Sequence, residues 1–458
     1  MRLQIGLTSA RGRSTTLTAE RLVNMFAEKA PDGSEAISVT HGVPGMVTHA
    51  TAGTGGCRAL CPVGNTLYAV VGQDLFAIDD AGNVSVSLGM VPGIDPLSVA
   101  TDGDIIVMVT DPNAFTYTIS TGTFAQITDP EYSGAHSVIW MNQTFIFAND
   151  EFHFVGAAGG LLPFDSLLAA SAEYAPDAIK GIARDHNELL IFGTTLEAWQ
   201  NVTVSAATDY PFEAISGATG EKGLASRNAI AQIDNTTVWL DQNGIVRRLA
   251  GGYVPQRIST EAIEHQLASA NLSTAEMLVY IVEGHECFAL NTDVGTFVYD
   301  ANTGLWHERQ SFGMTRWKAQ RSAFIWGSWY VGNVADGVIS RLDLDANGEN
   351  GTDLVATAVF PPVVFGRDRF TVEMLELGCD VGTGSYAVDP VVMLRTSRNG
   401  STWSNGAQRG MGLTGEYDRR VVWRRLGQYD KLHIRLDISH PYRRAIYAAY
   451  ASITRDDR

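Results

Sequence analysis

The sequence predicts an all-β fold: a six- to seven-bladed β-propeller-like body followed by a C-terminal antiparallel β-sandwich. Glycine is abundant, at 46 of 458 residues, and only 18% of residues are charged, which suits short strands joined by tight turns. Apolar residues alternate with polar ones or form short runs bounded by Gly, Asn, Asp and Pro, as they do in strands. Strand pairs also recur at steps of 34 to 50 residues, close to the ~40–50 residues of a propeller blade.

The chain divides into three parts. Residues 1–50 are expected to form an extended N-terminal segment, polar enough to be poorly ordered unless a partner holds it. Residues 51–345 carry the recurring strand pairs of the propeller, which start near residues 65, 103, 137, 187, 236, 277 and 322. These repeats have no WD or kelch signature, so a stack of unrelated hairpins is the alternative.

One helix is expected over residues 259–268. Ser259 suits the N-cap, and Glu261 falls in the first turn, where a negative charge is favourable. The rest of residues 51–345 has little helical pattern.

The composition changes near residue 346. A turn-rich stretch, ANGENGTD, starts at Ala346, and about six longer strands follow within 346–458, which predicts a β-sandwich. Residues 409–458 hold 11 basic and 6 acidic residues, which is a net charge of +5. Because the whole chain has a net charge of −17, the other 408 residues have a net charge of −22. A basic end on an acidic body indicates an interaction surface.

Charge, cysteine content and hydropathy exclude several classes of protein. The acidic balance argues against a protein that coats duplex DNA, because affinity for phosphate comes from Lys and Arg. Four cysteines are too few for a disulfide framework. No run approaches the ~18 apolar residues of a membrane span, and the N-terminus lacks the apolar stretch of a signal peptide. We expect a soluble protein made and kept in a reducing compartment.

The sequence offers few candidates for metal or catalytic chemistry. Asp343, Asp345, Asn347 and Gly348 resemble the first half of an EF-hand loop, but position twelve is Leu354 instead of Glu, so a solvated linker is preferred. Cys57 and Cys61 have no second cysteine pair at zinc spacing and are expected to be buried thiols. HExxH, Walker A, GxSxG and GxGxxG motifs are absent from the sequence, and we expect no enzyme activity, metal or cofactor.

A carbohydrate-binding or glycoside-cleaving propeller is the main alternative function. The stretch from Ser397 to Trp403 resembles the Asp-box hairpin of sialidase-like propellers, but it is one residue short and has Asn in place of Asp, so an ordinary hairpin is preferred. A sugar-active propeller needs an axial pocket with aromatic and acidic side chains, and nine tryptophans are compatible with that. A peptide-binding host scaffold is a third possibility.

The arginine-rich stretch RRVVWRRLGQYDKLHIRLDIS, from Arg419, is the best interface candidate. In a regular strand Val421 and Trp423 share one face, and flanking arginines rim this apolar strip. Arg and Trp are enriched in interface hot spots, and contact with an acidic partner would bury the tryptophan and pair the arginines. The alternative is a surface strand with solvated arginines. The interface candidates are Arg419, Arg420, Trp423, Arg424, Arg425 and Arg435.

Several of these stretches resemble one family. They are ERLVNMFAEKAPDGSEAISVTHGVPGM from Glu20, PDAIKGIARDHNELLIFGTTLEAWQN from Pro176, YPFEAISGATGEKGLASRNAI from Tyr210 leading into WLDQNGIVRRLAGGYVPQRISTEAIE from Trp239, and the arginine-rich stretch itself. In this order and spacing the chain resembles the packaged-DNA stabilisation proteins, or tail-nozzle proteins, of short-tailed bacteriophages.

The resemblance implies a structural protein of the virion tail, assembled in the host cytoplasm as a ring, usually a homohexamer. Such a ring lies below the portal and its adaptor ring, extends the channel for double-stranded DNA, retains the genome, and supports tail fibres or spikes and a needle or plug. The strongly acidic body agrees with a channel wall that lets DNA slide. We expect the arginine-rich sandwich and the segment from Thr8 to Pro44 to make contacts with neighbouring subunits or the adaptor.

Overall fold

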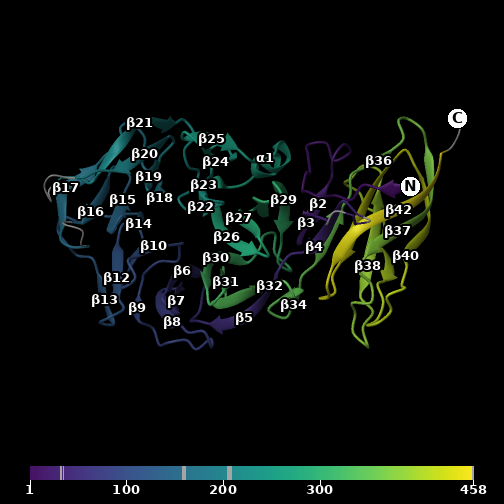
Figure 1. Ribbon diagram of the computed structural model, residues 1–458, viewed down its shortest axis with the longest axis horizontal. Coiled ribbons are helices and arrows are strands. Elements are labelled where there is room, and N and C mark those ends of the chain that lie inside the picture. The colour runs from purple at the N-terminus through teal and green to yellow at the C-terminus, as the bar shows by residue number, and fades with distance from the viewer. Residues whose placement is uncertain (31–32, 35, 157–160, 204–208, 456–458) are drawn as a thin grey trace.

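The computed structural model describes residues 1–30, 33–34, 36–156, 161–203 and 209–455. It shows a propeller and a sandwich side by side along the long axis of the molecule (Figure 1). The propeller has seven four-stranded blades in the described residues, and they follow one another clockwise from β6–β9 at the bottom of the figure. No helix among the described residues is long and apolar enough to cross a membrane.

Each blade is an antiparallel meander whose first strand lies nearest the axis. Blades one to three are β6 (Cys57–Val63), β7 (Thr66–Val71), β8 (Asp74–Ile78) and β9 (Gly89–Met90); β10 (Ser98–Thr101), β11 (Ile105–Val109), β12 (Ala114–Thr118) and β13 (Thr123–Gln126); and β14 (Ser137–Met141), β15 (Thr144–Ala148), β16 (His153–Gly156) and β17 (Phe164–Ala170). Blades four to six are β18 (Gly181–Asp185), β19 (Glu188–Phe192), β20 (Leu196–Asn201) and β21 (Phe212–Gly220); β22 (Ile230–Ile233), β23 (Thr236–Leu240), β24 (Val246–Ala250) and β25 (Val254–Arg257); and β26 (Glu276–Val282), β27 (His285–Asn291), β28 (Thr296–Asp300) and β29 (Leu305–Arg309).

Blade seven closes the ring of blades with a strand from the other end of the chain. It consists of β30 (Ala319–Ile325), β31 (Ser328–Asn333), β32 (Val338–Asp343) and, as its outer strand, β5 (Gly45–Thr51). β5 pairs antiparallel with β32 and leads directly into β6, the inner strand of blade one. The first and last blades are therefore held together by backbone hydrogen bonds.

Tight two-residue turns join the first two strands of several blades, and their residues mark the strand ends in the sequence. In blades three, five, six and seven the first hairpin has a two-residue loop, and both loop residues have positive φ: Asn142–Gln143, Asp234–Asn235, Glu283–Gly284 and Trp326–Gly327. Type I′ turns require this backbone, and their twist matches that of the flanking strands. Asn, Asp and Gly adopt it most readily.

Seven apolar clusters fill the spaces between adjacent blades. The cluster with Phe145 and Phe147 lies between blades two and three, and the cluster with Phe288 and Trp306 lies between blades five and six. Between those last two blades the chain also forms α1 (Glu261–Leu267) and η2 (Leu272–Thr274). The expected helix is present, but Thr260 and not Ser259 is its N-cap, and Thr260 Oγ1 accepts from Ile263 N at 3.4 Å.

The sandwich has two sheets around one large apolar cluster. The first sheet has the order β3 (Met25–Lys29), β4 (Ser38–Gly42), β42 (Ala445–Arg455), β37 (Phe370–Cys379) and β40 (Val421–Tyr429), with β1 (Arg2–Leu3) also paired to β42. The second has β35 (Ala356–Val359), β41 (Lys431–Ile438), β38 (Val391–Ser397) and β39 (Ala407–Gly410), with β36 (Val363–Val364) beside β41. The short strands β33 (Gly348–Glu349) and β34 (Thr352–Asp353) follow blade seven.

The first 50 residues do not form the extended segment that we expected. β1, β3 and β4 belong to the sandwich, β5 belongs to blade seven, and β2 (Arg21–Val23) bridges β29 of blade six and β35 of the sandwich. Strands of the same chain supply backbone partners for β1 to β5, and a role for a partner in ordering this segment stays a prediction.

Candidate interaction surfaces

The arginine-rich strand β40 lies at the edge of the first sandwich sheet, and its side chains alternate as expected. Val421 and Trp423 are both 1% exposed and point into the sandwich core. Trp423 Nε1 donates to the carbonyl oxygen of Ala407 at 2.7 Å. Trp423 therefore packs within its own chain, and its expected role as an interface anchor is wrong, because the inward face of the strand is already covered by the second sheet.

Four of the candidate arginines do lie on the surface of this edge. Arg420 forms a two-point ion pair with Glu376, at 2.7 and 2.6 Å, and Arg419 lies 3.7 Å from Asp389. Arg424 and Arg425 are exposed and form no hydrogen bond or ion pair with any residue that the structure describes. Their role in an interface remains a prediction.

A β-bulge explains why two consecutive arginines both face solvent. The register between β37 and β40 shifts between Val372 and Met374, and Arg425 has a φ of 57°. The extra residue breaks the strict alternation of faces and bends the strand. The arginine-rich edge, defined here as Arg419, Arg420, Arg424 and Arg425, thus presents its charges on one outer side of the sandwich.

Arg435 does not belong to this edge. We grouped Arg435 with the other arginines of this stretch, but β40 and β41 belong to opposite sheets, and the chain crosses between them at Asp430. Arg435 Nε donates to both carboxylate oxygens of Asp437, at 2.9 and 3.0 Å. Its charge is therefore paired on a different face.

The propeller axis holds a polar cavity of about 800 Å³ at one end. Its charged lining residues are Asp95, Asp111, Asp150, Glu276, Lys180, Arg227 and Arg321. None of the described residues that line it is Phe, Tyr or Trp. The stacking surfaces that the carbohydrate hypothesis requires on the axis are therefore missing from the described lining.

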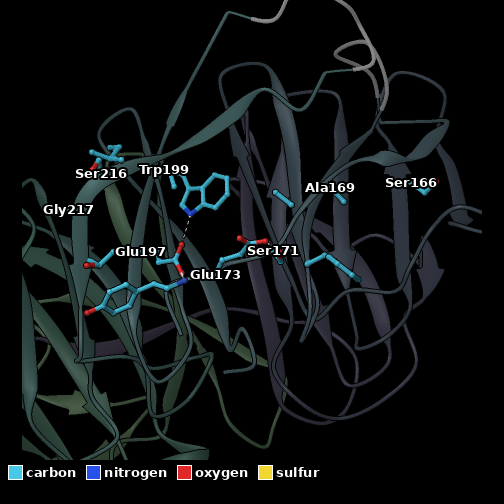
Figure 2. A pocket seen from close by; sticks show the side chains of 14 residues that line it. Ser166, Ala169, Ser171, Glu173, Glu197, Trp199, Ser216 and Gly217 are labelled. Atoms are coloured by element: carbon cyan, nitrogen blue, oxygen red, sulfur yellow. Dashed lines mark hydrogen bonds between the residues drawn. The ribbon is translucent and has the colours of Figure 1, made fainter. Parts of the chain in front are cut away.

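A second cleft, of about 670 Å³, is lined by residues of blades three and four (Figure 2). In Figure 1 these two blades lie on the side of the propeller away from the sandwich. Its aromatic residues include Phe152, Tyr174 and Trp199, of which Phe152 is 39% and Tyr174 50% exposed. Figure 2 shows Glu197 beneath the indole of Trp199. This carboxylate accepts from Trp199 Nε1 at 3.2 Å and from the backbone N–H of Tyr174 at 2.7 Å.

Sequence reasoning did not locate this cleft, because its lining comes from segments spread over residues 152–219. One signal was nevertheless available. Residues 137–220, which form blades three and four, contain ten Asp and Glu but only two Lys and Arg. The charged residues among the described lining are Glu173 and Glu197, and we call this hollow the acidic cleft.

The candidates for metal chemistry lie apart from one another. Cys57 packs between blades seven and one and Cys61 between blades one and two, since a register shift in β6 turns them to opposite faces. Burial raises the pKa of each thiol to about 12. Asp343 is paired with Arg341 at 2.7 Å. In the described part of the chain, no three His, Cys, Asp or Glu side chains are grouped as a metal site.

The Asp-box-like stretch is a turn that holds the N-terminal region. Asn399 Oδ1 accepts from the backbone N–H groups of Ser401 and Thr402, at 2.9 and 2.8 Å. Thr15 Oγ1 in turn donates to the carbonyl oxygen of Asn399 at 3.0 Å. These contacts give the turn a structural role within the sandwich.

Asn24, in the N-terminal stretch that carries the family resemblance, joins the propeller to the sandwich. It is 1% exposed with a φ of 56°. Its Nδ2 donates to the carbonyl oxygens of Gln310 and Val355, both at 2.8 Å, and its Oδ1 accepts from Gln310 N at 3.0 Å. Arg21 forms an ion pair with Glu308 across the same junction.

Comparisons with known structures concern the propeller. A computationally designed protein, Ika8, matches at 16% identity and a TM-score of 0.40, over 74% of this chain and 100% of its own. The extracellular domain of the putative hybrid two-component system BT4673 from B. thetaiotaomicron matches at 10% identity and a TM-score of 0.46. The match covers 65% of this chain and 39% of that protein. The Cps50 (Swd1) β-propeller domain of Myceliophteria thermophila matches at 10% identity and a TM-score of 0.43. The match covers 65% of this chain and 99% of that domain. These likenesses carry no information on function.

Family comparison is decisive for the whole chain. No curated protein matches at a significant level. The family model described as bacteriophage P22 Gp10, β-propeller, matches residues 3–347, and the model described as bacteriophage P22 Gp10, β-sandwich, matches residues 359–454. The two models cover the propeller and the sandwich in the order in which the structure presents them. The chain therefore belongs to the bacteriophage P22 Gp10 family and is a phage structural protein.

Proposed function

We propose that this protein is a ring subunit of the tail of a short-tailed phage, where it extends the DNA channel below portal and adaptor and helps to retain the packaged genome. The observation that carries the proposal is the match of both domains to the P22 Gp10 family models. The protein acts without turnover, as a component of the assembled virion tail. Its partners are copies of itself, the adaptor ring, and the fibre, spike or plug proteins.

The charge distribution supports passage of DNA instead of tight binding. Residues 1–408 carry a net charge of −22, against +5 for residues 409–458. A surface of the same sign as the phosphate backbone repels duplex DNA. A subunit that presents its acidic propeller to the channel lets the genome slide, while the basic sandwich remains free for protein contacts.

The size of the particle in dilute buffer tests the ring. Six chains of 49.4 kDa make a particle of about 300 kDa, and mass photometry of the purified protein is expected to find a species of that order, alone or upon addition of the adaptor ring. A chain that stays monomeric under both conditions and binds or cleaves glycans contradicts the proposal and supports the carbohydrate hypothesis.

A further inference from the structure

We propose that the acidic cleft of blades three and four binds a neutral oligosaccharide. The inference goes beyond the proposed function and does not depend on the ring. It is carried by two matching irregularities of the backbone, by the aromatic and hydroxyl groups beside them, and by the charges of the lining.

The outer strands of blades three and four carry the same irregularity. In β17, residues 165–168 lie opposite the single residue Val155 of β16, and in β21, residues 215–218 lie opposite the single residue Ala198 of β20. Each outer strand therefore holds a three-residue insertion, and the described registers of the outer strands in the other five blades hold none of this size. Insertions of this kind re-aim side chains and are frequent beside binding sites.

Both insertions contribute to the cleft. Ser166 occupies the second position of one insertion and Ser216 the second position of the other, and both residues line the cleft. The fourth positions, Leu168 and Ala218, are each 2% exposed and pack in apolar clusters of the propeller. Figure 2 shows Ser166 and Ser216 on opposite sides of the cleft. Two neighbouring blades thus supply equivalent walls to one hollow of about 670 Å³, a volume typical of ligand sites.

A single buried carboxylate fixes the aromatic part of the cleft. Glu197 is 5% exposed, and its two oxygens accept from the backbone N–H of Tyr174 at 2.7 Å and from Trp199 Nε1 at 3.2 Å. His153 packs edge to face against Trp199, with ring centroids 4.5 Å apart. The indole and the backbone of Tyr174 are therefore held in place before a ligand arrives, which lowers the entropic cost of binding.

The lining combines flat apolar faces with hydroxyl groups. Phe152 is 39% exposed and Tyr174 50%, so both rings offer surface to a ligand. Ser166, Ser171 and Ser216 add hydroxyl groups to the same lining. A pyranose ring has C–H faces that pack on aromatic rings, and its hydroxyl groups exchange hydrogen bonds with serine and carboxylate oxygens. A sugar therefore matches both features of the cleft.

The same lining disfavours other classes of ligand. Its described residues include Glu173 and Glu197 but no Lys, Arg or His, so a phosphorylated, sulfated or sialylated ligand would be repelled. The insertions bend β17 and β21, so these outer strands do not offer the regular edge that an added peptide strand needs. Ile215 is the one long aliphatic side chain in the described lining, so a lipid chain would gain little there.

A glycan array tests the class of ligand. The probes are short immobilised oligosaccharides of glucose, galactose, mannose and N-acetylhexosamine, with sialylated and sulfated counterparts on the same surface. The protein is expected to bind at least one neutral glycan and to bind its acidic counterpart more weakly. Isothermal titration calorimetry with the soluble form of the strongest neutral glycan then measures Kd, with one site expected per chain.

Substitutions in the cleft locate the bound glycan. Tyr174→Ala removes an exposed ring but keeps the backbone N–H that Glu197 accepts, and it is expected to raise Kd at least about tenfold. Tyr174→Phe keeps the ring and should retain most of the affinity. Ser216→Trp fills the cleft from the insertion in β21 and should abolish binding. The matched controls, Tyr386→Ala and Phe324→Ala, remove rings that are 88% and 54% exposed in the sandwich and in blade seven, and both should bind as wild type does.

The outcomes separate this inference from the proposed function. Circular dichroism and thermal unfolding verify that each variant is folded. Absence of saturable binding to every neutral glycan, or stronger binding to the acidic glycans, overturns the inference. Binding that survives both Tyr174→Ala and Ser216→Trp places the glycan elsewhere and also overturns it. A ring that binds no glycan leaves the proposed function standing, whereas a glycan-binding chain that never forms a ring contradicts the proposed function alone.

Discussion

Single side chains decide how the two domains are joined, and Asn24 is the clearest case. Its amide makes three hydrogen bonds to backbone groups of Gln310 and Val355 in a buried site. Its positive φ also suits Asn better than most residues. We expect Asn24→Ala to lower the free energy of unfolding by at least about 3 kcal/mol, because it leaves several buried backbone groups without partners.

Denaturant unfolding measures this effect, with Asn24→Gly as the comparison. Glycine keeps the backbone conformation at low cost but also loses the hydrogen bonds, so its loss of stability should be smaller than that of alanine yet clearly present. Stability equal to wild type in both variants contradicts this role for Asn24.

Two buried histidines make the stability of the fold depend on pH. Burial lowers the pKa of His153 and of His307 to about 3, whereas an unfolded histidine titrates near its ordinary value of about 6.5. Between these values the unfolded chain binds protons that the folded chain does not. Stability is therefore expected to fall as the pH decreases from about 6.5 toward about 3, by about 1.4 kcal/mol per pH unit for each histidine.

Replacement of one of these histidines isolates its contribution. In His153→Gln, the slope of unfolding free energy against pH should be smaller by about 1.4 kcal/mol per pH unit in the same interval. Equal slopes in the wild type and the variant would show that His153 is protonated in the folded protein as well.

At the scale of secondary structure, β5 controls whether the propeller is closed. It pairs Met46 with Leu342 and Val47 with Arg341 in blade seven. Met46 is 2% exposed and Val47 is 40% exposed, so adjacent positions of one strand provide a buried test site and an exposed control. We expect Met46→Asp to cost about 3–5 kcal/mol, since it places an unpaired charge in the core.

Thermal or denaturant unfolding of the two variants distinguishes closure from local packing. Val47→Asp should stay within about 1 kcal/mol of wild type, as surface substitutions usually do. A free closing strand would also expose blades one and seven, so limited proteolysis of Met46→Asp should cut first near these blades. Equal resistance to protease in both variants argues against a closing role for β5.

At the scale of the whole molecule, the division of charge predicts how strongly the proposed ring binds DNA. With −22 on the first 408 residues, isolated rings should bind duplex DNA only weakly at ~150 mM salt, where charges are screened beyond ~8 Å. Fluorescence anisotropy with a labelled duplex measures this. Submicromolar binding with a steep dependence on salt would place a basic groove along the DNA path.

Much of the architecture could be predicted from the sequence, because it rests on local chemistry. Blade strands follow from apolar alternation, and turns such as Asn142–Gln143 and Asp234–Asn235 contain residues that accept positive φ. The alternation in β40 likewise predicted that Val421 and Trp423 share a face. What the periodicity did not reveal is that this face already lies in the core of the sandwich, because alternation defines two faces without saying which one a second sheet covers.

The tertiary structure alone decided the relations between distant segments. β5 pairs with β32 almost 300 residues later, β40 and β41 separate into two sheets despite adjacency in the chain, and the acidic cleft joins segments of two blades. Each of these depends on which apolar faces can be buried together, and long-range packing is not encoded in any local period. The sequence by itself determined the strands, the turns and the separation of charge into an acidic body and a basic end; packing determined where the charges meet the surface.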